Sequence, residues 1–98
     1  MDKKQQQQQR IERARALVRE LVKAHDLEGG LEGSDYQLIA VGDSFSRRQM
    51  ERDIEAANKN LTNASWLKYT NEYQQQIARD RIQCLQMVLD NWEAITTV

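Results

Sequence analysis

The chain contains no proline, and its four glycines lie within 14 residues, at positions 29, 30, 33 and 42. Because glycine and proline interrupt regular structure more strongly than other residues, long helices can form on both sides of this window. The segment that follows it, residues 43–98, runs for 56 residues without either breaker. This distribution predicts a mainly α-helical protein with one short interruption after its first helix.

At 98 residues the chain has the size of a single domain. Charged residues make up 30% of it and the mean hydropathy is −0.81, yet the apolar residues recur at helical spacings, which indicates a folded protein. A domain this small buries only roughly 60–65% of the surface of its unfolded chain. We therefore expect a homo-oligomer or a partner protein to complete the burial of its apolar surface.

The first segment, residues 5–25, is predicted to be an amphipathic helix. Its apolar residues and the only histidine recur at steps of three and four and share one face: Ile11, Ala14, Leu17, Val18, Leu21 and His25. His25 stands at the expected end of the helix, where its positive form interacts favourably with the helix dipole. We therefore assign it no metal-binding or acid–base role.

Residues 26–44 are predicted to form an acidic loop followed by a short β-strand. Glycines and acids fill residues 27–35, and the sequence Tyr-Gln-Leu-Ile-Ala-Val at residues 36–41 has the only strand character in the chain. A lone strand leaves its backbone groups unpaired and needs a second strand beside it. Either residues near Leu31, in a hairpin, or the same strand of another copy would supply it.

A second helix is predicted over residues 47–61. Ser46 and Gln49 have the spacing of a capping box, and Phe45 and Met50 stand at the two positions of a hydrophobic staple. A narrow apolar stripe then continues the helix: Met50, Ile54, Ala57 and Leu61. The weak helix formers that follow predict either a turn or a bend between about residues 58 and 65.

The last helix is predicted over residues 65–95, and its apolar face is broad. That face carries Ile77, Ala78, Ile82, Leu85, Val88, Leu89, Trp92 and Ile95. It is wider than a surface helix of a 98-residue monomer needs, so we expect it to be buried on two sides, in part by another chain. The predicted interface residues of this segment are Trp66, Tyr73, Leu85, Val88, Leu89 and Trp92.

Charge is segregated along the chain. Residues 1–25 carry a balance of +4, residues 26–46 carry −5 without any Lys or Arg, and residues 47–98 balance to zero. A basic ridge on the first helix and an acidic loop suit head-to-tail contacts between copies. The arginines at 47 and 48 fall in the first turn of the second predicted helix, where cations are unfavourable unless acids or an external anion offset them. The charged residues of the predicted interface are Arg15, Arg19, Lys23, Asp35, Asp43, Arg47 and Arg48.

The sequence predicts neither catalysis nor a metal or cofactor site. Ser44 and Ser46 have no nearby histidine, the loop acids lack the spacing of a calcium loop, and the glycines precede a predicted strand. Cys84, the only cysteine, has no further ligand at metal-binding spacing and is interpreted as a structural thiol. We therefore expect a non-enzymatic protein without cofactors.

The composition also bears on two further questions, namely the class of partner and the compartment. A net charge of −1 and a pI near 5.8 argue against nucleic acid as a partner. The polar N-terminus does not resemble a signal peptide, and no apolar run is long enough to span a membrane. The sequence therefore predicts a cytoplasmic protein.

Residues 36–61 resemble the middle of small phage head–tail joining and connector proteins. The resemblance rests on a helix ending near His25, a short β element, the turn at Gly42-Asp43, and a serine-capped helix with an apolar seam: Ser44, Ser46, Met50, Ile54 and Leu61. It covers about residues 1–60, and the last predicted helix has no counterpart in it. The resemblance implies a virion part that forms rings between the portal and the tail.

Two functions fit these features. The first is a self-associating structural protein, such as a virion connector, whose partners would be the portal or tail. The second is a small inhibitor or regulator of the phage or plasmid type, which would block a host protein through its acidic insert at residues 26–46. The first predicts a high-order ring, and the second predicts a monomer or dimer that binds one partner.

Overall fold

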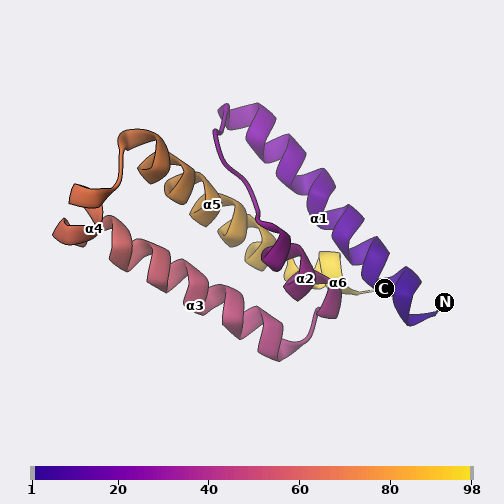
Figure 1. Cartoon of the computed structure of the whole chain (residues 1–98). Helices are drawn as coiled ribbons and strands as arrows, with labels where there is room; N and C mark the ends of the chain where they lie inside the picture. The colour runs from indigo at the N-terminus through magenta and orange to yellow at the C-terminus, as the bar shows by residue number, and fades with distance from the viewer. Residues whose placement is uncertain (1, 98) are drawn as a thin grey trace.

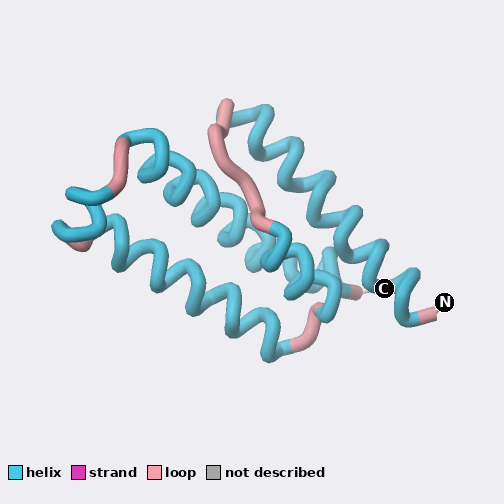
Figure 2. Tube along the Cα trace, viewed as in Figure 1, coloured by secondary structure: helices cyan, strands magenta, loops and turns pink. Residues whose placement is uncertain are grey.

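The computed structural model describes residues 2–97. These residues form six helices and no strand (Figures 1 and 2): α1 (Lys3–His25), α2 (Gly33–Val41), α3 (Ser44–Leu61), α4 (Ala64–Tyr69), α5 (Glu72–Asp90) and α6 (Trp92–Thr96). The mainly α-helical class predicted from the sequence is confirmed. The predicted strand is not.

Helix α1 begins two residues earlier than predicted and ends where predicted. The Asp2 side chain accepts a hydrogen bond from the Gln5 backbone N–H at 2.8 Å, and the Gln5 side chain accepts one from the Asp2 N–H at 3.3 Å. This capping box makes the glutamine-rich start part of the helix. At the other end, Asp26 adopts a left-handed conformation (φ 51°) and its N–H donates to the Val22 carbonyl, which ends the helix after His25.

Residues 36–41, predicted as a strand, belong to helix α2 instead. A short apolar run does not distinguish a buried strand from a buried helix. Here the hydrogen bonds that stop and start the helix involve residues on either side of the run. At the start, the Glu32 N–H donates to Asp35 Oδ2 at 2.9 Å. At the end, Gly42 has φ 65° and donates its N–H to the Leu38 carbonyl at 2.9 Å. Glycine adopts this left-handed conformation without strain, so Gly42 is the stop signal of α2.

Helix α2 covers part of the core that α1, α3 and α5 share. Ile39 is fully buried, and Tyr36 and Leu38 pack against the same cluster, whereas Val41 is 51% exposed. Because the helix pairs its backbone groups internally, the segment needs neither a hairpin nor a strand from another copy.

Helix α3 begins at Ser44, three residues earlier than predicted, because Asp43 rather than Ser46 is its N-cap. Asp43 Oδ1 accepts a hydrogen bond from the Ser46 backbone N–H at 2.8 Å, and Ser46 itself is buried in the first turn. The predicted capping box is therefore wrong. Gln49 donates to Asp53 one turn further along, at 3.0 Å.

The predicted hydrophobic staple is also wrong, because Phe45 is 65% exposed while Met50 is fully buried in the core. The earlier start of α3 places Arg47 and Arg48 beyond the first three helical positions. Both side chains are exposed, and Arg47 Nε lies 3.8 Å from Glu51 Oε1. The carboxylate of Asp43, the N-cap, interacts favourably with the positive end of the helix dipole, so no external anion is needed there.

The hydrogen bonds to Asp43 predict that the start of α3 is acid-sensitive. The bond from the Ser46 N–H is the main cause that lowers the pKa of Asp43 below its usual value of 3.8. Because the folded-state pKa is depressed, the stabilisation is present above the unfolded-state value and is lost as the pH falls through the folded-state value. Asparagine caps helices equally well without titrating. Between about pH 5 and about pH 3, wild type should therefore lose more stability than Asp43→Asn in urea unfolding followed by circular dichroism; equal losses would contradict this role.

The predicted interruption near residues 58–65 is a turn between two helices. Helix α3 ends at Leu61, and Thr62 follows it. Asn63 is then the N-cap of α4, because its side chain accepts a hydrogen bond from the Trp66 N–H at 3.0 Å. The sequence left a turn and a bend open, and the structure has the turn.

The single helix predicted over residues 65–95 is wrong, since the chain forms α4, α5 and α6 there. Asn71 caps α5, where its side chain accepts a hydrogen bond from the Gln74 N–H at 2.8 Å. Asn91 separates α5 from α6 and donates its side-chain amide to the Met87 carbonyl at 2.8 Å. Two asparagines thus divide a segment that has no glycine or proline.

Helix α5 lies at the centre of the molecule, between α1 and α3 (Figure 1). The linker of residues 26–32 and helix α2 cover one side of α5, and α6 turns against α1. The core lies where these helices meet and draws residues from five of them: Ala14, Ile39, Met50, Leu85, Val88, Leu89, Trp92 and Ile95.

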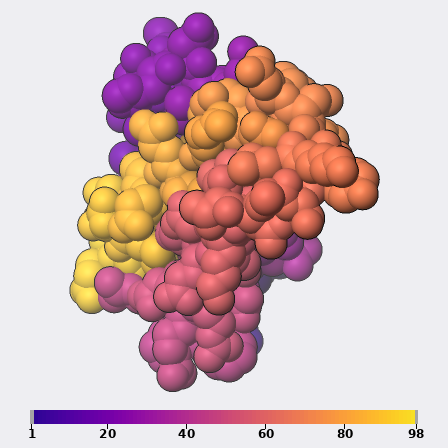
Figure 3. Space-filling model, turned by 90° about the vertical axis from the view of Figure 1, so that its left-hand side faces the viewer, coloured from indigo at the N-terminus to yellow at the C-terminus, as the bar shows by residue number. Residues whose placement is uncertain are grey.

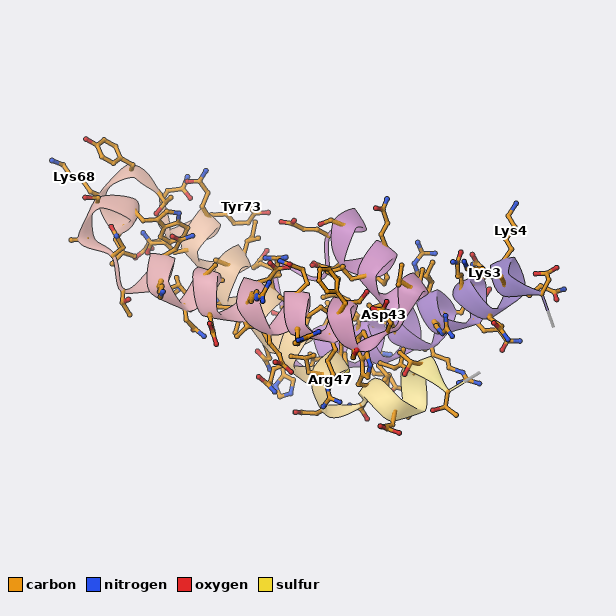
Figure 4. All side chains as sticks on the ribbon, turned by 90° about the horizontal axis from the view of Figure 1, so that it is seen from below. Lys3, Lys4, Asp43, Arg47, Lys68 and Tyr73 are labelled. Carbon is orange, nitrogen blue, oxygen red and sulfur yellow. The ribbon has the colours of Figure 1, made fainter. Side chains whose placement is uncertain are left out.

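The molecule is elongated, with extents of 49 × 28 × 19 Å. Lys68 lies at one end of it and Lys3 and Lys4 lie toward the other, whereas Tyr73 lies some way in from the Lys68 end (Figure 4). In the space-filling view, helix α4 and the start of α5 form a protrusion at one corner (orange in Figure 3).

Candidate protein-interaction surface

The linker of residues 26–32 is fixed to α5 by a buried carboxylate. Asp80, which is 2% exposed, accepts hydrogen bonds from the backbone N–H groups of Glu28 (2.7 Å) and Gly29 (3.1 Å) and from the Gln76 side chain (2.8 Å). A Cβ atom on Gly29 would lie 3.0 Å from the Ile77 carbonyl oxygen, so the close approach requires glycine. The acidic loop predicted from the sequence is therefore tied to the central helix.

A second buried carboxylate joins α2 to α5. Asp35 is fully buried, and its oxygens accept hydrogen bonds from Arg81 Nε at 3.0 Å and Nη2 at 2.8 Å. This bidentate pair raises the pKa of the Arg81 guanidinium above its usual value. Asp35 thus stabilises the chain's own fold, which corrects its predicted place at an interface.

Two arginines of α1 bind the carbonyl ends of α2 and α6. Arg10 Nη1 donates to the Ala40 carbonyl at 2.9 Å, and its Nε donates to the Thr96 carbonyl at 3.3 Å. Arg13 Nη1 donates to the Ala94 carbonyl at 3.1 Å and the Thr97 carbonyl at 2.7 Å. Cations at helix C-termini satisfy unpaired carbonyls and the negative end of the dipole, so this clamp holds α1, α2 and α6 together.

The predicted apolar interface of the last segment lies inside the chain. Leu85 and Val88 are fully buried, Trp92 is 6% exposed and Leu89 is 9% exposed. Burial on two sides occurs as predicted, but α1 and α3 of the same chain provide it. These four side chains are therefore not available to another chain.

The basic ridge of α1, defined by Arg15, Arg19 and Lys23, remains exposed. The guanidinium of Arg15 lies over the ring of Tyr36, 5.1 Å from its centroid, which is a cation–π contact within the chain. Burial of Tyr36 in this position raises the pKa of its hydroxyl. Arg19 and Lys23 are the members of the ridge that remain open to a partner.

Three aromatic residues stand close together in the sequence where α4 is followed by α5, and we call Trp66, Tyr69 and Tyr73 the aromatic tip. Tyr69 is 82% exposed, Tyr73 is 59% exposed, and Trp66 is half-buried. They are three of the six aromatic residues of the chain, within eight positions. Large exposed aromatic groups on a small domain are typical of binding surfaces. Trp66 and Tyr73 belong to the interface predicted from the sequence, whereas Tyr69 of the same aromatic-rich stretch does not.

The backbone beneath the aromatic tip is held by side-chain hydrogen bonds. Gln75 Nε2 donates to the carbonyls of Leu67 and Thr70 and to the Thr70 hydroxyl, each at 3.2 Å. The Thr70 hydroxyl donates to the Trp66 carbonyl at 2.7 Å. Together with the asparagine caps of α4 and α5, these bonds hold the backbone that carries the aromatic tip.

A pocket opens beside the aromatic tip, between α3, α4 and α5. Its volume is about 240 Å³, and its apolar lining comes from Trp66, Ala57, Ile77 and Ala78. Glu32 and Arg81 lie at its polar side. The pocket and the tip together form a surface with both a projecting and a receiving part.

The structure also places Cys84 and His25, the two residues that the sequence analysis considered as candidate metal ligands. Cys84 is fully buried, and burial is the main cause that raises the pKa of its thiol. His25 is exposed at the last position of α1. Residues 2–97 contain no cluster of three or more metal-ligating side chains. None of the six described helices combines the length and the apolar character required to cross a bilayer.

Comparisons of the chain with protein-family models, with curated proteins and with solved structures found no match.

Proposed function

We propose that this chain is a non-enzymatic interaction protein that binds a partner protein through its aromatic tip. The exposure of Tyr69 (82%) and Tyr73 (59%) on a pre-organised part of the backbone carries the proposal. Tyrosine and tryptophan dominate binding hot spots because they supply large contact areas with few rotatable bonds. Since α4 contributes no residue to the buried core, its aromatic residues gain their full burial only against another molecule.

The chemistry of the aromatic tip indicates what kind of partner surface would bind it. Two projecting tyrosine rings require an apolar cleft with hydrogen-bond acceptors for their hydroxyl groups. The pocket beside Trp66 accepts one apolar side chain of the partner. Lys68, whose Nζ lies 5.9 Å from the centroid of the Tyr69 ring, favours an acidic group at the edge of the contact. The partner is thus a folded protein with an apolar, acid-rimmed cleft.

The two functions left open by the sequence differ in the binding surface and in the assembly that they require. A virion connector would use the tip to join portal or tail subunits, and it would form a ring. An inhibitor acting through residues 26–46 has fewer acids at its disposal, because Asp35 is buried against Arg81 and Asp43 caps α3. Asp26, Glu28 and Glu32 remain exposed there. We therefore favour the tip over the acidic insert as the binding surface.

The double variant Tyr69→Ala/Tyr73→Ala tests the tip. A partner captured from the source cells with the wild-type chain is identified, purified and titrated by calorimetry. The double variant should bind it at least about thirtyfold more weakly, because a hot-spot aromatic contributes about 2 kcal/mol or more. Both tyrosines are exposed, so the helicity and the unfolding midpoint should not change.

A matched control removes two exposed apolar side chains away from the tip. Val41→Ala/Phe45→Ala should leave the affinity unchanged, since these residues flank the turn between α2 and α3. Loss of binding in Asp26→Asn/Glu28→Gln/Glu32→Gln, with an unaffected tip variant, would transfer the function to the acidic insert. Binding of single-stranded nucleic acid by wild type with a steep salt dependence would contradict a protein partner.

A further inference from the structure

The pocket beside the aromatic tip combines an apolar wall with a charged edge. Three helices supply the wall: Trp66 of α4, Ala57 of α3, and Ile77 and Ala78 of α5. Two charged residues, Glu32 and Arg81, and two amides, Asn60 and Gln74, complete the lining. A volume of about 240 Å³ is smaller than that of pockets for drug-sized ligands, so the pocket suits a single side chain.

The charged edge of the pocket is negative on balance. Both oxygens of the buried Asp35 accept hydrogen bonds from Arg81, at 3.0 and 2.8 Å, so the charge of this guanidinium is already compensated. Two more carboxylates lie close to Arg81, with Glu32 Oε1 3.9 Å from its Nε and Asp53 Oδ2 3.9 Å from its Nη2. Three carboxylates around one guanidinium leave a formal charge of −2.

Glu32 is the carboxylate that a ligand in the pocket would meet. It lines the pocket and its side chain is 66% exposed, whereas Asp35 is buried and Asp53 accepts a hydrogen bond from Gln49 at 3.0 Å. Within residues 2–97 the one ion pair of Glu32 is the contact with Arg81, whose 3.9 Å exceeds hydrogen-bond length. The Glu32 carboxylate therefore keeps acceptor sites for a cation.

The cations of neighbouring segments do not offset this negative charge. Lys59, Lys68 and Arg79 adjoin pocket residues in the sequence, but none of them lines the pocket. Lys68 Nζ lies 5.9 Å from the centroid of the Tyr69 ring, and Arg79 donates to Gln76 at 3.2 Å. The negative balance is thus a property of the pocket itself.

We propose that this pocket binds a basic side chain, arginine or lysine, of the partner protein. Long basic side chains place their methylene stem on apolar surface and their charged end at a polar edge, which matches a wall containing Trp66 and an edge containing Glu32. Tryptophan also attracts cations to its ring more strongly than tyrosine or phenylalanine does. The inference rests on the proposed function for the molecule that carries the cation, and it refines the side chain placed in the pocket there: apolar along its stem and charged at its end.

Two other occupants fit the pocket less well. A carboxylate would have to compete with Asp35 for the Arg81 guanidinium and would lie among three acids. A purely aliphatic side chain would fill the wall, but it would displace water from the Glu32 carboxylate and offer it no partner. The basic side chain satisfies both parts of the lining.

Three small probes of similar shape test the charge preference of the pocket in the full chain. n-Butylguanidinium carries the end of an arginine, n-butylurea is its neutral counterpart, and n-pentanoate is an anion. The NMR signal of the Trp66 indole N–H reports binding, and the buried Trp92 provides an internal reference. We expect a dissociation constant of about 20 mM for n-butylguanidinium, in the range for so few atoms. n-Butylurea should bind about threefold more weakly, and n-pentanoate more weakly still.

Three variants assign the preference to the pocket. Glu32→Gln should bind n-butylguanidinium and n-butylurea equally, because the carboxylate that distinguishes them is gone. Glu28→Gln, the matched control, removes an exposed acid of the same linker that does not line the pocket, and it should keep the threefold preference. Ala78→Leu fills the pocket with a good helix former and should abolish the shifts caused by all three probes. Circular dichroism should show unchanged helicity in each variant.

Three results would overturn the inference: equal binding of n-butylguanidinium and n-butylurea by wild type, tighter binding of n-pentanoate, or no saturable shift up to about 100 mM. Tyr69→Ala/Tyr73→Ala leaves the lining intact and should bind n-butylguanidinium as wild type does. If that variant loses the partner while wild type does not bind the probe, only this inference fails. If wild type binds the probe but the variant keeps its affinity for the partner, only the proposed function fails.

Discussion

Replacing Arg81 with methionine is expected to lower the free energy of unfolding by about 3 kcal/mol, because the change leaves a buried carboxylate without its cation. Asp35 is fully buried and would keep only the Glu32 N–H as a donor. The Arg81 side chain is itself 19% exposed, so the lower part of the range for buried ion pairs applies. Urea unfolding followed by circular dichroism measures the loss.

Two further variants separate the ion pair from the simple loss of an arginine. Arg48→Met removes an exposed arginine of α3 and should change the stability by less than about 0.5 kcal/mol. The combination Asp35→Leu/Arg81→Met removes both charges and should recover much of the loss, since apolar replacements of buried ion pairs are often neutral. If Arg81→Met costs no more than Arg48→Met, the pair does not hold α2 against α5.

Replacing Leu85 with aspartate is expected to abolish the folded state, with a loss greater than about 4 kcal/mol. The side chain of Leu85 is fully buried at the centre of the molecule, between helices of the same chain. A carboxylate placed there has neither water nor a cation beside it, so it is hydrated only when the chain unfolds. Circular dichroism and a collapsed thermal transition would report the result.

The same variant decides between two views of the broad face of α5. From the sequence alone, Leu85→Asp would either dissociate an oligomer or unfold the chain. With Leu85 inside the core, we expect unfolding at every concentration. Gln83→Asp, two positions earlier on the exposed side, should leave a dilute sample fully helical. A helical but dissociated Leu85→Asp protein would contradict the observed core.

Local patterns in the sequence predicted the parts of the fold that depend on local forces. The apolar spacing of residues 11–25 predicted α1, and His25 is its last residue as expected. The cluster of weak helix formers after residue 57 predicted an interruption, either a turn or a bend, where the structure has the turn between α3 and α4. In each case the signal is carried by neighbours within one or two helical turns, which is the range over which helix propensity and capping act.

The missed helix α2 shows where such reasoning fails. The β-branched and aromatic residues of positions 36–41 favour a strand only if no helical packing is available. Ile39 finds such packing against the core, and Asp35 finds Arg81, which is 46 positions further along the chain. Contacts over that distance cannot be derived from a window of six residues. The local signal that remained was Gly42, a glycine at the C-terminal position that ends helices.

The apolar residues of α5 and α6 that were predicted at an interface lie in the core instead, for a related reason. The width of the apolar face on α5 was predicted from its own sequence, and burial on two sides is what the structure has. Which molecule provides the burial depends on how the chain returns on itself, through the linker that Asp80 fixes and the turn at Asn63. Trp66 and Tyr73, by contrast, were also predicted at an interface, and both keep part of their surface exposed in the structure.

The arginine clamp between α1 and the final helix has a consequence for how the protein is made. Arg10 reaches across 86 positions to Thr96, and Arg13 across 84 to Thr97. Translation delivers Arg10 and Arg13 long before the carbonyl groups that they bind have left the ribosome. The same order of synthesis holds for the core, because its last two members, Trp92 and Ile95 of α6, are among the last residues to be made, so the nascent chain cannot complete its core before α6 emerges.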